Sequence, residues 1–244
     1  MGVIITVLKI VIILGFLVLI HEAGHFLVAR LCKIKVNEFS IGFGPLIWKK
    51  DTSKTKYSIR LIPLGGYVNM LGEEERSEEE GSFSQASIPK RIVIVAAGGL
   101  VNILFAIILY IILITIVTGD FVTSLTSTGD FIMAMVDSIK LLFTGGVTVD
   151  SLMGPIGISE VVAQTSGIID FLYIMALISM SLGVTNLLPF PPLDGGKILI
   201  YIIEAIRRKP LKENFELKLQ MIGFVALITL SIYVAFNDVG RIIG

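Results

Sequence analysis

Four long apolar segments constrain the fold of this 244-residue chain more than any other feature. They lie at residues 3–29, 92–118, 168–206 and 217–236. A helix that crosses a bilayer needs about 20 mostly apolar residues, so each segment is long enough for a span. The chain is 54% hydrophobic and only 16% charged, which excludes a water-soluble domain, a disordered chain and a nucleic-acid-binding protein. We expect an all-α polytopic membrane protein with four transmembrane helices, organised as a single domain over residues 1–244.

The third apolar segment is too long for one simple helix. Residues 189–196 read Pro-Phe-Pro-Pro-Leu-Asp-Gly-Gly. Because proline lacks the backbone donor that a helix interior needs, we expect the helix to break near residues 186–196. A broken helix at membrane depth is tolerated only where protein or a polar cavity surrounds it. This break is therefore a candidate site before any motif is considered.

The positions of the basic residues predict the orientation in the membrane. Residues 30–91 and 197–218 hold 17 of the 20 Lys and Arg residues. Loops rich in Lys and Arg stay on the cytoplasmic side. We therefore expect both regions in the cytoplasm and both termini outside it.

The first cytoplasmic loop has a strand-like pattern over residues 35–71. Tyr57, Ile59 and Leu61 alternate with polar side chains, which is a strand-like pattern. We expect a small membrane-associated β element here. Two interpretations stay open: an exposed edge that pairs with an extended substrate, or structural packing alone.

The segment outside the cytoplasm, residues 119–165, is short. Small polar residues from 123 to 129 predict a flexible joint. Apolar residues at helical spacing then predict an interfacial helix over residues 131–143, with these side chains on one face: Phe131, Met135, Ile139 and Leu142.

The first apolar segment contains the sequence His21-Glu22-Ala23-Gly24-His25. On a helix this spacing puts both imidazoles on one face, where they can bind one zinc ion, and Glu22 lies beside them as a general base. The chain has only two histidines, so this motif arises by chance about once in two thousand such sequences. The alternative is a pair of packing histidines, but ionisable residues inside a span are costly and functional as a rule.

A catalytic zinc ion usually has three protein ligands, and here the third must be a carboxylate because no histidine or second cysteine remains. His21 lies about 27 Å along the first segment, close to its cytoplasmic end. Asp194 follows a comparable length of the third segment and should meet it at the same depth. Three other acidic residues in apolar surroundings lie at the wrong end of the spans: Asp120, Glu160 and Asp170. Glu204 lies beyond Asp194, near the basic residues, so Asp194 is the expected third ligand and Glu204 the next candidate.

Together with the histidine motif, residues 186–195 (Asn-Leu-Leu-Pro-Phe-Pro-Pro-Leu-Asp-Gly) resemble the site-2 protease family of intramembrane zinc metalloproteases. Four shorter stretches are similar to its bacterial regulator-of-sigma-E branch: residues 39–45, 62–68, 98–102 and 154–156. The resemblance implies a zinc endopeptidase of the bacterial inner membrane with its site near the cytoplasmic face. Its substrates would be single-span membrane proteins such as anti-sigma factors, cut in or near the transmembrane segment.

Carried over residue by residue, the resemblance makes His21, His25 and Asp194 the zinc ligands and Glu22 the general base. It also implies that Asn186 and Asn102 hold the substrate backbone near the metal. Their structural alternatives are an amide that caps the helix break, for Asn186, and close helix packing, for Asn102.

This branch usually carries PDZ domains between the second and third spans, and the short segment over residues 119–165 leaves no room for one. We also consider a non-hydrolytic zinc-binding membrane protein or zinc transporter, and a scaffold that binds substrate without cutting it. Glu22 distinguishes these functions, because a transport site needs ligands but no adjacent base.

Overall fold

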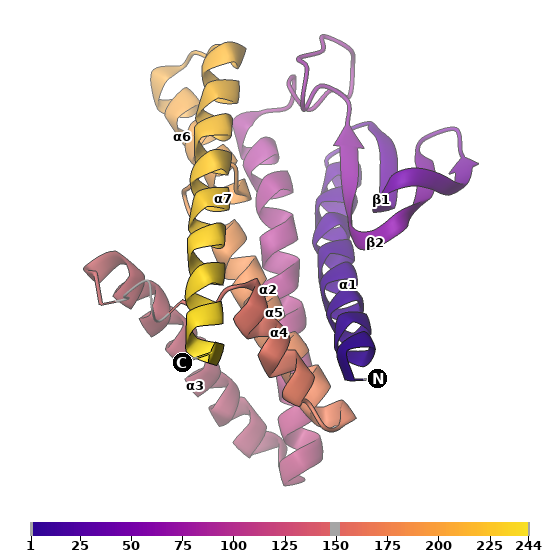
Figure 1. Cartoon of the computed structure of the whole chain (residues 1–244). Coiled ribbons are helices and arrows are strands. Elements are labelled where there is room, and N and C mark those ends of the chain that lie inside the picture. Colours follow the sequence, from indigo (N-terminus) through magenta and orange to yellow (C-terminus); the bar gives the residue numbers. More distant parts are fainter. Residues whose placement is uncertain (1, 147–151, 244) are drawn as a thin grey trace. The chain divides into compact units, whose positions relative to one another are not determined.

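The structure is a computed structural model that describes residues 2–146 and 152–243 (Figure 1). Its helices and strands follow one another along the chain in this order: α1 (Gly2–Leu31), β1 (Val36–Asp51), β2 (Lys56–Met70), α2 (Ile88–Thr118), α3 (Phe121–Thr144), α4 (Pro155–Gln164), α5 (Ile168–Asn186), α6 (Asp194–Arg207) and α7 (Glu213–Ile243).

Helices α1, α2, α5 and α7 are each long and apolar enough to cross a membrane. With the two-stranded sheet β1–β2 they confirm the expected class, an all-α polytopic membrane protein with a small β element. The third apolar segment divides into α5 and α6. Residues 187–193 between them are not helical, because the prolines at 189, 191 and 192 cannot continue the hydrogen-bonding pattern of α5.

The described chain forms two compact units. The first unit contains Val11–Ile103 and Leu182–Met221. The second unit contains the remaining described residues at 2–10, 104–146, 152–181 and 222–243.

Glycines allow the helices of the first unit to pack closely. A Cβ atom on Gly24 of α1 would lie 2.7 Å from the carbonyl oxygen of Ala97 in α2. A Cβ atom on Gly183 of α5 would lie 2.6 Å from the carbonyl oxygen of Gly99, also in α2. These contacts are possible only without side chains, and they bring the three helix backbones together.

A hydrophobic core holds the sheet, the end of α1, the start of α2 and α6 together. Buried residues from all four elements contribute: Ala29, Ile34, Val36, Met70, Phe83, Ile94, Val95, Ile200 and Tyr201. This core fixes the beginning of α6 beside α1 and α2.

Strands β1 and β2 are long and bent, so their segments pair more than once. Residues 36–41 pair with residues 66–70 and also with residues 56–59, while residues 46–51 pair with residues 56–60. Residues 56–60 are therefore central in the sheet and cannot supply the open edge that a substrate would need. The candidate edges are residues 46–51 and 66–70.

The second unit corrects one prediction from the sequence. Residues 123–129, expected to form a flexible joint, lie within the continuous helix α3. Asp120 begins this helix as its N-cap, since its carboxylate accepts hydrogen bonds from the amides of Val122 and Thr123 at 3.1 and 3.0 Å. Phe131 of α3 stacks on Tyr110 of α2 with ring centroids 4.5 Å apart.

Helix α4 was not expected from the sequence, and charged side chains from two spans hold its ends. The amide of Gly157 donates to the Asp238 carboxylate of α7 at 2.9 Å. Lys9 of α1 donates to the carbonyl oxygen of Thr165 at 2.7 Å. A carboxylate at the N-terminus and an ammonium group at the C-terminus both match the helix dipole.

Candidate metal centre

Two imidazoles of α1 form one side of the candidate centre. His21 and His25 are buried one turn apart, and their Nε2 atoms are 3.2 Å from each other. The Nδ1 atom of His25 is 2.9 Å from the carbonyl oxygen of Ile94 in α2. Because a carbonyl can only accept, Nδ1 carries the proton and Nε2 keeps its lone pair for a metal.

The third group comes from the start of α6. The Oδ2 atom of Asp194 lies 3.2 Å from Nε2 of His21 and 3.3 Å from Nε2 of His25. Asp194 is in the first helical turn, where the dipole favours a negative charge. The next residue, Gly195, has no space for a side chain because a Cβ atom would meet the carbonyl oxygens of Leu187 and Leu188. This glycine lets α6 begin directly against the broken segment.

The three atoms have the spacing that a tetrahedral zinc ion requires. Zinc bonds of 2.0–2.1 Å at tetrahedral angles place neighbouring ligand atoms roughly 3.3–3.4 Å apart. The measured separations are 3.2, 3.2 and 3.3 Å. Oδ2 of Asp194 is buried and accepts no hydrogen bond within the described part of the chain. Two imidazole nitrogens and one carboxylate oxygen are also a typical donor set of catalytic zinc sites, so these residues fit the ion.

Gly98 of α2 leaves the space that the centre needs. A Cβ atom at this position would lie 2.7 Å from Nε2 of His21 and would also collide with Nε2 of His25. Both are the nitrogens that face Asp194. Any side chain at Gly98 would therefore enter the space between the ligands.

The two asparagines differ in their surroundings. Asn102 is completely buried, and its Nδ2 lies 3.5 Å from Nδ1 of His21. Asn186 is the last residue of α5, is half-buried, and forms no side-chain hydrogen bond with the described residues. The amide of Asn186 is thus not used to cap the helix break, whereas Asn102 lies against an imidazole.

Glu204, the next candidate after Asp194 for the third ligand, contacts neither histidine of the candidate centre. It is buried, its Oε2 lies 3.2 Å from Nη1 of Arg91, and its Oε1 accepts a hydrogen bond of 2.7 Å from the amide of Leu211. Glu204 therefore serves an ion-pair network at the end of α6.

A contact that sequence reasoning missed lies one turn after Asp194. The Lys197 ammonium group is 2.9 Å from Oε1 of Glu73, which belongs to the acidic loop after β2. The two residues line a cavity of about 750 Å³ between this loop, α6 and the start of α7. Glu73 begins an acidic run over residues 73–80, and nothing in the local sequence indicates that this residue reaches α6.

The model of the peptidase family M50 matches residues 9–230 of the chain. The chain belongs to peptidase family M50. This M50 peptidase is therefore a multi-pass membrane protein of the site-2 protease type, as the motifs indicated.

Curated relatives cover almost the whole M50 chain. A predicted zinc metalloprotease of Fusobacterium nucleatum is 28% identical and aligns with 97% of this chain and 99% of its own length. A similar protein of Clostridium acetobutylicum is 28% identical over 92% of this chain and 94% of its own. The regulator of sigma-W protease RasP of Bacillus subtilis is 24% identical over 97% of this chain and 99% of its own.

These relatives are longer than the M50 chain described here. The Fusobacterium alignment extends over 337 positions and this chain has 244 residues, so at least 93 positions have no counterpart in it (337 − 244). The RasP alignment is longer still, at 416 positions.

Proposed function

We propose that this protein is an intramembrane zinc endopeptidase that cuts single-span membrane proteins in or near their transmembrane segments. The observation that carries the proposal is the triangle of His21 Nε2, His25 Nε2 and Asp194 Oδ2, built partly on the spanning helix α1. The names of the relatives, which are zinc metalloproteases and a sigma-W regulator protease, support zinc and this substrate class.

In this proposal His21, His25 and Asp194 hold the zinc ion. Bound zinc supplies Lewis acidity to a peptide carbonyl and a water molecule. Glu22 follows His21 directly and is half-buried beside the three ligands. Its carboxylate accepts a proton from the attacking water and returns it to the leaving amine, as a general base and then a general acid.

Substrate must reach this site in an extended form, because a helical peptide bond is shielded by its own hydrogen bonds. The non-helical residues 187–193 lead directly to Asp194, and Asn186 precedes them at the end of α5. The side-chain amide of Asn186 forms no hydrogen bond with the described residues. We assign to Asn186 the role of binding the substrate backbone. The bound segment would then lie between the helix break and the zinc ligands.

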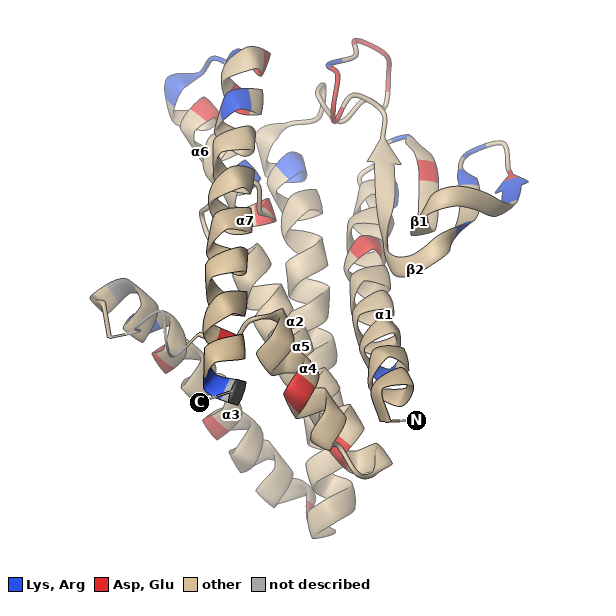
Figure 2. Ribbon diagram, viewed as in Figure 1, with Lys and Arg blue, Asp and Glu red and all other residues tan. Residues whose placement is uncertain are grey.

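We further propose that the site faces the cytoplasm of a bacterial inner membrane, with both termini outside. The distribution of Lys and Arg supports this orientation: 17 of 20 lie in residues 30–91 and 197–218. Figure 2 shows basic residues at the sheet tip and beside the acidic loop of the first unit. The proposed partners are the bilayer and membrane-protein substrates.

Replacement of Glu22 tests the proposal. Glu22→Gln should keep zinc, because all three ligands remain, and should lower the cleavage rate of a single-span reporter by at least about 10²-fold, the contribution expected of a general base. Zinc content and cleavage are measured on both proteins. Equal cleavage would contradict the peptidase mechanism and favour a non-hydrolytic zinc-binding protein or zinc transporter, for which Glu22 has no role.

A further inference from the structure

A strongly basic pocket lies between the end of α1 and the tip of the sheet, away from the candidate metal centre. Its volume is about 410 Å³. Its polar lining comes from the last turn of α1, the following loop, β1 and the turn between the strands: Arg30, Lys33, Lys35, Asn37, Ser53 and Lys54. We call it the basic pocket.

Most positive charges of the basic pocket have no carboxylate partner. None of the described residues that line it is acidic, and of its four cations only Lys35 forms an ion pair with a described residue, Glu79. Arg30, Lys33 and Lys54 form no ion pair with any residue in the described ranges. The guanidinium of Arg30 has only a long hydrogen bond, 3.4 Å to the Thr55 hydroxyl. The pocket therefore has an uncompensated charge that attracts an anion.

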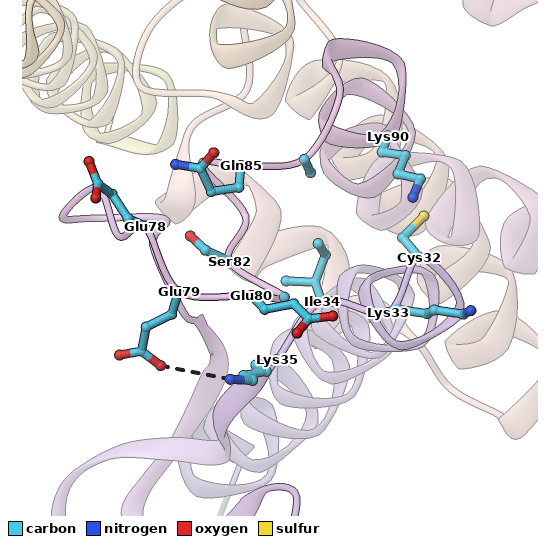
Figure 3. Close-up of a pocket in the computed structure, with 12 residues that line it drawn as sticks. Cys32, Lys33, Ile34, Lys35, Glu78, Glu79, Glu80, Ser82, Gln85 and Lys90 are labelled. Atoms are coloured by element: carbon cyan, nitrogen blue, oxygen red, sulfur yellow. Dashed lines mark ion pairs between the residues drawn. The ribbon is translucent and has the colours of Figure 1, made fainter.

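In a neighbouring pocket, lysine side chains lie together with carboxylates. It has a volume of about 610 Å³ and is lined by lysines and by the glutamates 78–80 (Figure 3). There the ammonium group of Lys35 lies 3.7 Å from Oε2 of Glu79. Both side chains are more than half exposed, so this ion pair is weak. Lys33 and Lys35 line both pockets, so the acidic loop partly balances Lys35 of the basic pocket as well. It leaves Arg30, Lys33 and Lys54 without an ion-pair partner among the described residues.

The basic pocket lies where the chain leaves the bilayer. Arg30 is in the last turn of α1, at the end of the first candidate span. The bends of the adjacent sheet expose eight large apolar side chains: Phe43, Leu46, Ile47, Trp48, Ile59, Leu61, Ile62 and Leu64. An apolar surface of this kind beside a basic strand end is typical of contact with a membrane interface.

We propose that the basic pocket binds the phosphate headgroup of an anionic phospholipid. The planar guanidinium of Arg30 matches the geometry of phosphate oxygens, Lys54 adds charge from the turn between the strands, and the Ser53 hydroxyl can donate a hydrogen bond. The acyl chains would lie along the exposed apolar side chains of the sheet. A bound headgroup would then hold the sheet tip to the end of α1.

Trp48 provides a direct probe, because it is the single tryptophan of the chain and lies on the exposed part of the sheet. The full-length protein in neutral detergent is titrated with dioleoylphosphatidylglycerol, and the emission of Trp48 is recorded. We expect saturable blue-shifted emission. Dioleoylphosphatidylcholine, which has no net charge, should produce a much smaller change at the same concentrations.

The variant Arg30→Gln with Lys54→Gln removes two positive charges from the basic pocket. Each basic residue near an anionic lipid surface contributes about fivefold in affinity, so this variant should bind phosphatidylglycerol about 25-fold more weakly. Lys209→Gln with Lys212→Gln removes the same charge from exposed positions elsewhere and should bind as the wild type does. Zinc content and thermal unfolding of each variant establish that it is folded.

The proposal is overturned if the pocket variant binds phosphatidylglycerol as tightly as the control variant. It is also overturned if phosphatidylcholine gives the same response, or if inorganic phosphate alone does, since the ligand would then be a soluble anion. Should the double variant fail to fold, Lys54→Gln alone changes an exposed turn residue and should weaken binding about fivefold.

Discussion

At the scale of single residues, the space between the proposed ligands depends on a position that carries no functional group. Gly98 faces the Nε2 atoms of both imidazoles, and nothing larger than hydrogen fits there. Its neighbour Gly99 instead packs against Leu187 and the carbonyl oxygen of Gly183. Two adjacent glycines of α2 thus have different roles, one toward the candidate centre and one toward α5.

We predict that Gly98→Ala lowers zinc affinity by at least about tenfold, because the added methyl group displaces an imidazole. A loss of about 1.4 kcal/mol in the free energy of zinc binding is enough for this factor. Zinc content after dialysis at fixed free zinc measures the effect. Gly129→Ala is the matched control, since a Cβ atom there meets nothing within 4 Å. Retention of zinc by Gly98→Ala equal to that of the control would show that the metal lies elsewhere.

Alanine variants of the two asparagines should have different defects. Asn102 lies against His21 and positions it, so Asn102→Ala should lower zinc affinity by about 10- to 100-fold. Asn186→Ala should keep zinc and lower kcat/KM by a similar factor, because a substrate contact is lost. If both variants keep zinc and both lose kcat/KM, Asn102 also binds substrate, as the family resemblance implies.

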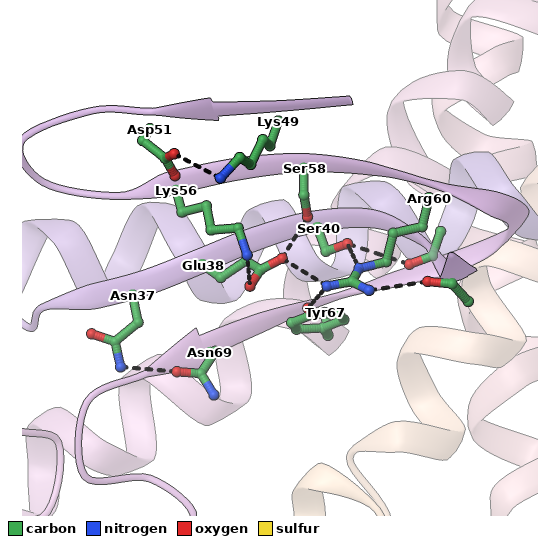
Figure 4. A network of polar contacts seen from close by, with 12 residues as sticks. Asn37, Glu38, Ser40, Lys49, Asp51, Lys56, Ser58, Arg60, Tyr67 and Asn69 are labelled. Carbon is green, nitrogen blue, oxygen red and sulfur yellow. Dashed lines mark hydrogen bonds and ion pairs between the residues drawn. The ribbon is translucent and has the colours of Figure 1, made fainter. Parts of the chain in front are cut away.

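At the scale of elements, a polar network stabilises the sheet between its apolar bends (Figure 4). The Glu38 carboxylate accepts hydrogen bonds from Ser58, Lys56 and Arg60 at 2.6, 3.1 and 3.1 Å. Tyr67 in turn accepts a hydrogen bond of 2.8 Å from Arg60. The network joins residues of β1 to both halves of β2.

This network predicts a pH dependence of stability. Burial disfavours the charged form of Glu38, but the hydrogen bonds from Ser58, Lys56 and Arg60 outweigh it and lower its pKa to about 2, from an ordinary value of 4.5. The stabilisation is therefore fully present above about pH 4.5 and is lost as the pH falls toward 2. We expect the difference in thermal unfolding midpoint between wild type and Glu38→Gln to shrink from pH 6 to pH 3. A constant difference across this range would contradict the assignment.

At the scale of the whole molecule, the M50 chain is shorter than its relatives, by at least 93 aligned positions in the Fusobacterium comparison. The described segment after α2 consists of α3 and α4 with short connections. We propose that this segment is too small to filter substrates by the size of their outer domains. PDZ domains, which the family resemblance places after the second span, are expected to provide such a filter.

We predict that this protein cuts a single-span substrate with a folded outer domain nearly as fast as the same substrate without it. Insertion of a PDZ domain between Gly119 and Asp120, in the turn between α2 and α3, should slow cleavage of the bulky substrate selectively. Equal rejection of the bulky substrate with and without the insertion would mean that the spans themselves form the filter.

The sequence alone was sufficient to predict the membrane class and four spans, and to indicate His21, His25 and Asp194 as candidate metal ligands. Apolar segments of spanning length have few alternatives to helices in a bilayer, and the spacing of His21 and His25 fixes their common face. The helix break before Asp194 could also be predicted from the sequence, because proline excludes a continuous helix whatever surrounds it. These are local properties, which a sequence expresses directly.

Which distant groups meet depends on the tertiary structure. The approach of Asp194 to the imidazoles depends on close packing at Gly24, Gly98 and Gly183, and on a core formed by residues far apart in the chain. The continuous helix α3 contradicts the flexible joint because an N-cap and a stacking partner outweigh weak helix propensity. The basic pocket likewise joins Arg30 to Lys54 across a folded sheet. No local pattern determines such contacts, because the free energy that favours them comes from burial and from charges that only folding brings together.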